Sequence, residues 1–113
     1  MTNPAVNELS PAEAARALAG GAFLLDVREP EEWGAGHAPE AYHIALGELG
    51  ARVEELPASA EIIVVCRVGG RSMAAAQALV GAGYNAVNLA GGMVVWAAEG
   101  YAVVADGGAG IVV

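Results

Sequence analysis

One seven-residue segment, Cys66-Arg67-Val68-Gly69-Gly70-Arg71-Ser72, lies between two runs of different character and constrains the fold more than any other stretch. The residues before it, Ile62 to Val65, are branched and apolar, which predicts a buried strand. The residues after it, Met73 to Val80, are rich in helix formers and are followed by glycines that suit a helix end. The only cysteine is therefore expected at the carboxyl end of a strand, where open α/β sheets bind ligands.

This loop suits Cys66 to carry a negative charge. An unperturbed thiol has a pKa of about 8.5, and a helix N-terminus or cationic neighbours lower that pKa. Gly69 and Gly70 let several backbone N–H groups point inward, and Arg67 and Arg71 add positive charge that can bind an anion. We expect Cys66 to be an exposed, nucleophilic thiolate near neutral pH. The alternative is an inert, buried cysteine.

Composition limits the classes of function. A chain of 113 residues with 56% hydrophobic residues predicts one folded domain, residues 1–113. No apolar run approaches the about 20 residues of a membrane helix, no secretory signal pattern is visible, and one cysteine cannot form an internal disulfide, so a cytoplasmic location is expected. A net charge of −8 without any lysine argues against nucleic acid or a membrane surface as partner.

Strand and helix patterns alternate along the chain. Ser10-Pro11-Ala12-Glu13 has the spacing of a helix start with a capping box. The predicted strands are 6–9, 22–27, 42–45, 62–65 and 85–89, and the predicted helices are 10–19, 28–33, 47–56, 73–80 and 93–98. This order predicts an α/β fold with a mainly parallel sheet covered by helices on both faces. We expect a folded core over about residues 5–104; the glycine-rich stretch 106–110 has the composition of a flexible link, and the sequence leaves open whether the tail over 105–113 packs or frays.

Three other polar residues are candidates for the site. Asp26 interrupts an apolar strand, where a carboxylate has either a structural or a chemical role, and a buried acid is normally paired. His37 and His43 are the only histidines, and either could act as a general base for Cys66. We favour structural roles for both.

Three motifs, in order, resemble those of the rhodanese family of single-domain sulfurtransferases. They are Leu25 to Trp33 with Gly36-His37, the loop Cys66 to Ser72, and Ala82 to Leu89 with Gly91-Gly92 and Trp96. Pro39-Glu40 departs from the Pro-Gly that is common in the family. The resemblance implies a three-layer fold with five parallel strands, no cofactor or metal, and no histidine base. It also implies Cys66 as the catalytic residue, structural roles beside the site for Asp26 and Arg28, and a substrate-binding loop of Arg67, Val68, Gly69, Gly70, Arg71 and Ser72.

The activity implied is transfer of a sulfane sulfur through a persulfide on Cys66. The donor would be thiosulfate or another persulfide, and the acceptor would be cyanide or a thiol. One alternative is a carrier module that relays sulfur between proteins. Another is a cysteine-based phosphatase or arsenate reductase, but those enzymes have five residues between cysteine and arginine, whereas four separate Cys66 from Arg71 here.

Overall fold

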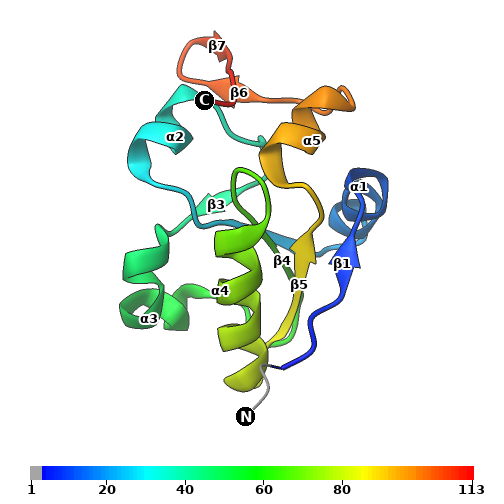
Figure 1. Ribbon diagram of the computed structural model, residues 1–113, viewed down its shortest axis with the longest axis vertical. Helices are drawn as coiled ribbons and strands as arrows, with labels where there is room; N and C mark the ends of the chain where they lie inside the picture. Colours follow the sequence, from blue (N-terminus) through cyan, green and yellow to red (C-terminus); the bar gives the residue numbers. More distant parts are fainter. Residues whose placement is uncertain (1–3) are drawn as a thin grey trace.

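The computed structural model describes residues 4–113, and a parallel sheet runs through its centre (Figure 1). The five strands have the spatial order β1-β5-β4-β2-β3. They comprise β1 (Glu8–Leu9), β2 (Phe23–Asp26), β3 (Tyr42–His43), β4 (Glu61–Val65) and β5 (Asn85–Leu89). All neighbouring pairs in this sheet are parallel, which confirms the predicted α/β class.

Helices follow most of the strands. They are α1 (Pro11–Ala19), α2 (Pro30–Ala35), α3 (Leu49–Arg52), α4 (Gly70–Gly81) and α5 (Gly92–Ala98). The predicted capping box of α1 is present, because Ser10 Oγ accepts from the Glu13 amide while the Glu13 carboxylate accepts from the Ser10 amide. None of the helices in residues 4–113 is long and apolar enough to cross a bilayer.

Two predicted helices differ in extent. The helix expected over 47–56 is present as far as Glu55, but only its central turn, α3, is α-helical, and 3-10 turns flank it at Leu46–Glu48 and Val53–Glu55. Gly47 and Gly50 lower the helix propensity of this segment, which is consistent with its broken form. By contrast α4 begins at Gly70, three residues before the predicted start at 73, because Gly69 turns the chain in a left-handed conformation with φ 113°. The end of the predicted loop is thus the first turn of a helix.

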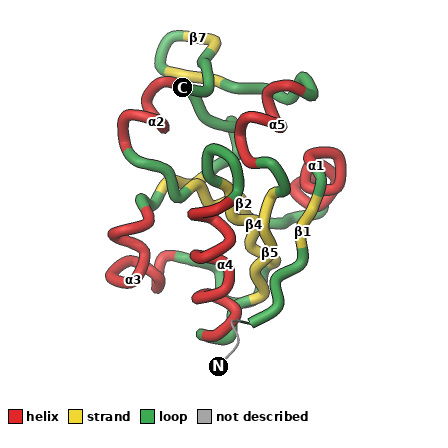
Figure 2. Tube along the Cα trace, in the orientation of Figure 1, coloured by secondary structure: helices red, strands yellow, loops and turns green. Residues whose placement is uncertain are grey.

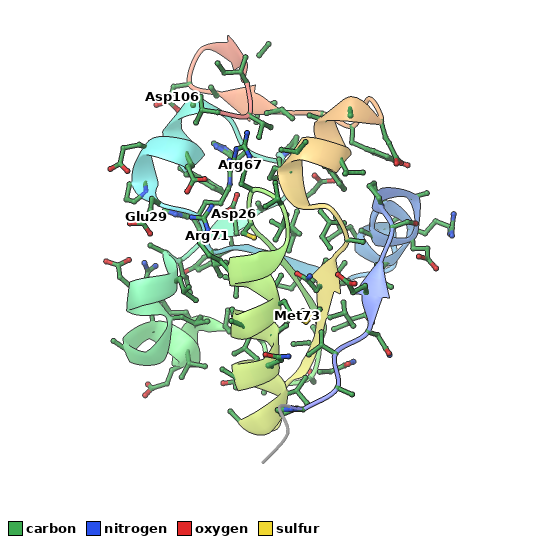
Figure 3. The ribbon with its side chains drawn as sticks, in the orientation of Figure 1. Asp26, Glu29, Arg67, Arg71, Met73 and Asp106 are labelled. Atoms are coloured by element: carbon green, nitrogen blue, oxygen red, sulfur yellow. The ribbon has the colours of Figure 1, made fainter. Side chains whose placement is uncertain are left out.

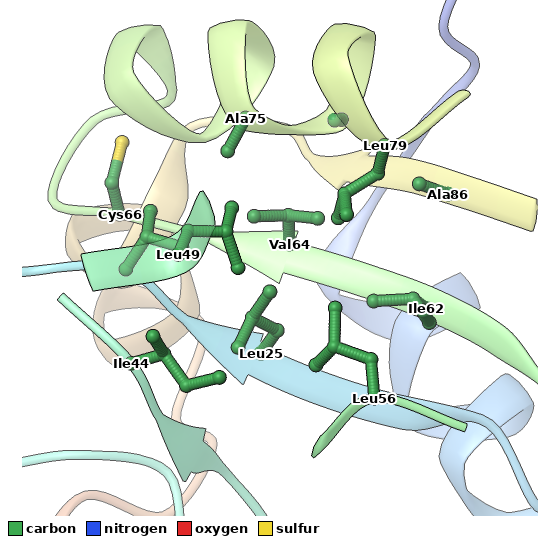
Figure 4. Close-up of a cluster of buried hydrophobic side chains, with 12 residues drawn as sticks. Leu25, Ile44, Leu49, Leu56, Ile62, Val64, Cys66, Ala75, Leu79 and Ala86 are labelled. Atoms are coloured by element: carbon green, nitrogen blue, oxygen red, sulfur yellow. The ribbon is translucent and has the colours of Figure 1, made fainter. Parts of the chain in front are cut away.

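The central strand β4 contributes to two hydrophobic layers. Ile62 and Val64 face a cluster completed by Leu25, Ile44, Leu49, Leu56, Ala75 and Leu79, which joins the sheet to α3 and α4 (Figure 4). Ile63 and Val65 face a second cluster with Ala14, Leu24, Val87, Leu89, Met93 and Trp96, which joins the sheet to α1 and α5. Burial on both faces explains the uninterrupted apolar run of this strand.

The carboxyl-terminal residues pack at the end of the molecule where the sheet strands terminate. An antiparallel hairpin of β6 (Val104–Ala105) and β7 (Gly108–Ala109) lies beside α2 and α5 (Figures 1 and 2). The amides and carbonyls of His37 and Val104 are hydrogen-bonded to each other, and the Ile111 amide donates to the Ala35 carbonyl. A hairpin and these contacts therefore occupy the segment for which the sequence indicated only a flexible link.

Candidate active site

Cys66 directly follows β4 and lies at the floor of the loop that leads into α4. Its Sγ is directed toward that loop rather than toward Leu49 and Val64 in the core (Figure 4). The residue nevertheless has 0% of its surface exposed. The expectation of an exposed thiolate is therefore wrong for exposure, because the loop and the hydrophobic cluster together enclose the sulfur.

Several hydrogen-bond donors surround the sulfur. The Gly69 amide donates to Cys66 Sγ at 3.1 Å, and the Ser72 hydroxyl oxygen lies 3.2 Å from Sγ. Burial alone raises the pKa of Cys66, but the hydroxyl of Ser72 and the amides of Ser72, Gly69 and Val68 lower it, and the net pKa is below its ordinary value. The loop therefore favours a thiolate at Cys66, as predicted from its glycines.

The beginning of α5 anchors the cysteine-bearing loop. The Met93 amide donates to the Cys66 carbonyl at 2.9 Å, and the Val94 amide donates to the Arg67 carbonyl at 3.1 Å. Gly92 permits this approach: its φ is +63°, and an added Cβ would lie 2.5 Å from both carbonyl oxygens. The Gly91-Gly92 pair of the third motif thus sets the position of the backbone that carries the sulfur.

The two loop arginines have protein partners. Arg71 Nη1 and Nη2 bind the two carboxylate oxygens of Glu32 on α2 at 2.7 and 2.8 Å. These hydrogen bonds lower the pKa of Glu32 to about 2. Arg67 Nε donates to the Val113 carbonyl at 2.9 Å, so the loop also contacts the carboxyl-terminal residues. Figure 3 shows Arg67 above and Arg71 below Asp26 in this view.

Asp26 and Arg28 form a buried ion pair beside the loop. Both side chains are 0% exposed, and Arg28 Nη2 lies 2.8 Å from the Asp26 carboxylate. The Arg28 amide and Nε also donate to Asp26, and Nη2 donates to the Gly36 carbonyl at 2.7 Å. The pair thereby ties the end of β2 to the residue that follows α2. These contacts are what a structural role requires.

The histidines bind backbone groups. A ring nitrogen of His37 lies 2.9 Å from the Trp33 carbonyl, and one of His43 lies 2.7 Å from the Arg28 carbonyl. Both rings stack on the indole of Trp33, with centroid distances of 3.6 and 4.8 Å. Within residues 4–113 no hydrogen bond joins either ring to Cys66, so the geometry gives no sign of a histidine base.

Comparison with known proteins agrees with this geometry. The family model described as "Rhodanese-like domain" matches residues 10–99. The chain belongs to the rhodanese-like domain family. The match covers the whole sheet apart from the two residues of β1, together with all five helices.

Relatives of this rhodanese-like domain include curated and solved proteins. The Bacillus subtilis protein named "Putative sulfurtransferase YtwF" is 40% identical over 77 residues, which are 68% of this chain and 75% of that protein. A rhodanese-related protein from Thermoplasma volcanium superimposes with a TM-score of 0.82 at 33% identity, covering 87% of this chain and 97% of that one. A thiosulfate sulfurtransferase from Pseudomonas aeruginosa gives a TM-score of 0.79 at 26% identity, covering 88% of this chain but 20% of its own. These relatives support a sulfurtransferase family for this rhodanese-like domain.

Two residues of the rhodanese-like site were missed by the sequence reasoning. Glu32 holds Arg71 from a position 39 residues away, and no local pattern pairs the two. Asn88 on β5 is 1% exposed and lies 2.6 Å from Ser72. A polar residue inside the otherwise apolar run 86–89 was a signal that could have identified it.

Proposed function

We propose that this rhodanese-like domain transfers a sulfane sulfur from thiosulfate, or from another persulfide donor, to cyanide or a thiol by way of a Cys66 persulfide. The observation that carries the proposal is the ring of donors around Cys66 Sγ, with the Gly69 amide at 3.1 Å, which favours the nucleophilic thiolate. Four residues between Cys66 and Arg71 make a cradle smaller than a phosphate-binding loop, which supports sulfur over phosphate as the group transferred.

In the first half-reaction the Cys66 thiolate attacks the outer sulfur of thiosulfate. A bond forms between Sγ and that sulfur, the sulfur–sulfur bond of thiosulfate breaks, and sulfite leaves with the bonding electron pair. The negative charge then resides on the terminal sulfur of the persulfide. The loop amides that lower the pKa of Cys66 are placed to stabilise this charge as well.

In the second half-reaction an acceptor attacks the outer sulfur of the persulfide. Cyanide takes up the sulfur and becomes thiocyanate, or a thiolate takes it up and becomes a new persulfide. The bond between the two sulfur atoms breaks, and Cys66 is regenerated as a thiolate. Cys66 is the only cysteine, so no internal thiol can resolve the persulfide and the acceptor must come from outside the chain. That acceptor can be a small molecule or the thiol of a relay protein.

The loop arginines bring the donor to the sulfur. Arg67 has no Asp or Glu partner among residues 4–113, and we assign it the stronger attraction for the oxygens of thiosulfate. Arg71 contributes positive potential while its guanidinium remains on Glu32. The chain has a net charge of −8, which supports small anions attracted by the loop arginines as partners, rather than nucleic acid or an anionic membrane. A cytoplasmic location fits the free thiol.

Intact-mass measurement after incubation with thiosulfate tests the proposal. The expected result is the gain of one sulfur atom, reversed by cyanide, with no gain in Cys66→Ala. A folded Cys66→Ala variant that still converted thiosulfate and cyanide to thiocyanate at the wild-type rate would refute it. A gain of sulfur from glutathione persulfide but not from thiosulfate would keep the Cys66 persulfide and replace the donor.

A further inference from the structure

A buried polar network adjoins Cys66. The Ser72 hydroxyl oxygen lies near three acceptors, with Asn88 Oδ1 at 2.6 Å, Cys66 Sγ at 3.2 Å and the Gly69 carbonyl at 3.3 Å. A serine hydroxyl has one hydrogen, so it can donate fully to one acceptor at a time. Ser72 is 0% exposed and Asn88 is 1% exposed, so water does not donate to the acceptors that the Ser72 hydrogen leaves unserved.

The orientation of the Asn88 amide decides where that hydrogen goes. Asn88 Nδ2 lies 3.0 Å from a carboxylate oxygen of Glu8 on β1 and 3.2 Å from the Gly69 carbonyl. Two hydrogens on Nδ2 match these two acceptors, whereas a flipped amide would place its oxygen against a carboxylate and a carbonyl. Glu8 therefore fixes Asn88 Oδ1 toward Ser72. Since Oδ1 can only accept, the 2.6 Å contact requires the Ser72 hydrogen to point to Asn88.

We propose that Asn88 is a positioning residue that holds the hydroxyl hydrogen of Ser72 away from Cys66 until the sulfur becomes anionic. In the thiol form, the Cys66 S–H donates to the Ser72 oxygen, which donates in turn to Asn88. When Cys66 loses its proton to solvent, the Ser72 hydroxyl must leave Asn88 Oδ1 to donate to the thiolate. The thiolate thus gains a hydrogen bond only at the expense of one that Asn88 already has.

The charged groups near the site have partners of their own, which do not depend on Asn88. Arg71 on α4 is paired with Glu32 on α2, and the Asp26–Arg28 pair lies at the end of β2. Glu8 is exposed, so its carboxylate is hydrated without Asn88. The Gly69 carbonyl also accepts from the Met73 amide at 3.1 Å, so no buried acceptor is left unpaired when the Asn88 amide is removed.

The experiment is titration of Cys66 in Asn88→Leu, followed by the ultraviolet absorbance of the thiolate, which is unambiguous because the chain has one cysteine. We expect the pKa of Cys66 to fall, because the Ser72 hydroxyl loses its closest competing acceptor and keeps only the more distant Gly69 carbonyl, at 3.3 Å. We expect Ser72→Ala to raise it. At a pH below the wild-type pKa, the rate of sulfur uptake from thiosulfate should rise about threefold to tenfold in Asn88→Leu, the effect of one redirected hydrogen bond.

A double-mutant cycle separates this competition from other causes. Because Asn88 acts through Ser72, Asn88→Leu should have no effect on the Cys66 pKa in a Ser72→Ala background. Asn85→Leu, the same replacement at the exposed start of β5, is the matched control and should leave the pKa unchanged. Asn88→Val, a smaller replacement that suits a strand, should shift the pKa in the same direction as Asn88→Leu, which a packing disturbance specific to leucine would not do.

A Cys66 pKa that rises or does not move in both Asn88 variants would overturn the proposal. An equal fall with and without Ser72 would overturn it too. The role of Asn88 in catalysis rests on the proposed sulfur transfer, but the titration of Cys66 does not. If the protein takes no sulfur from thiosulfate, the shift in the Cys66 pKa still tests the role of Asn88.

Discussion

Replacing Gly92 with alanine separates two reasons for a glycine at the start of α5. The first is backbone conformation, because φ is +63° at Gly92 and residues with a Cβ are disfavoured there by about 1 kcal/mol. The second is space, because the new Cβ would lie 2.5 Å from the carbonyl oxygens of Cys66 and Arg67. These contacts are with backbone atoms, so the cysteine-bearing loop must move to relieve them.

Movement of the loop breaks the hydrogen bonds from Met93 and Val94 to those two carbonyls. Each such bond contributes about 1 kcal/mol, so we expect Gly92→Ala to lower the free energy of unfolding by about 3 kcal/mol in all. The displaced loop also moves the donors away from the sulfur. We therefore expect the pKa of Cys66 to rise and persulfide formation to slow in the fraction that stays folded.

Gly100→Ala is the matched control. Gly100 also has a positive φ, +88°, but nothing lies within 4 Å of its would-be Cβ. It should show only the conformational cost, with normal sulfur uptake. Urea unfolding gives the stabilities, and intact mass after a timed thiosulfate pulse gives the uptake. If Gly92→Ala matched Gly100→Ala in both measurements, the claim that α5 positions the loop would be refuted.

Two further predictions concern the ion pairs around the loop. The pKa of Glu32 is lowered from 4.5 to about 2, so its bond to Arg71 stabilises the fold fully above pH 4.5 and loses its effect as pH falls toward 2. The stability difference between wild type and Glu32→Gln, measured by urea unfolding across this range, should vanish at the acid end; a constant difference would contradict the assignment. Asp26→Asn leaves Arg28 as a buried charge without its carboxylate, and the free energy of unfolding should fall by about 3 to 5 kcal/mol. Glu55→Gln in an exposed pair should change it little, and similar losses in the two variants would show that burial of the Asp26–Arg28 pair is unimportant.

Local patterns were sufficient to predict most of the fold. The strand 85–89 matches β5 at both ends, and the capping signature at Ser10 places the start of α1 correctly. These signals depend on neighbours within one turn or one strand. The apolar spacing over 47–56 predicted a helix, and residues 46–55 are helical, but the two glycines disfavour a regular α-helix and most of the segment is 3-10.

The site was predictable where its chemistry is local. The placement of Cys66 after a buried strand, with glycines that direct amides toward it, follows from one stretch of seven residues. Its burial does not, because the surrounding hydrophobic cluster includes Ile44 and Leu49 from other parts of the chain. The partner of Arg71 and the contact between Asn88 and Ser72 also depend on how separate elements align in three dimensions.

The complete enclosure of Cys66 has a consequence for the catalytic cycle proposed above. Protein interiors are close-packed, so a second sulfur atom on Sγ needs volume that the unloaded pocket must open. An added Cβ at Gly70 would meet nothing within 4 Å, whereas the residues of β4 below Cys66 are buried, so we expect the loop rather than the sheet to adjust. If Cys66 carries sulfur as proposed, the domain with the persulfide should differ in shape at this end of the molecule from the domain with the free thiol. An acceptor would then distinguish the two forms before sulfur is transferred.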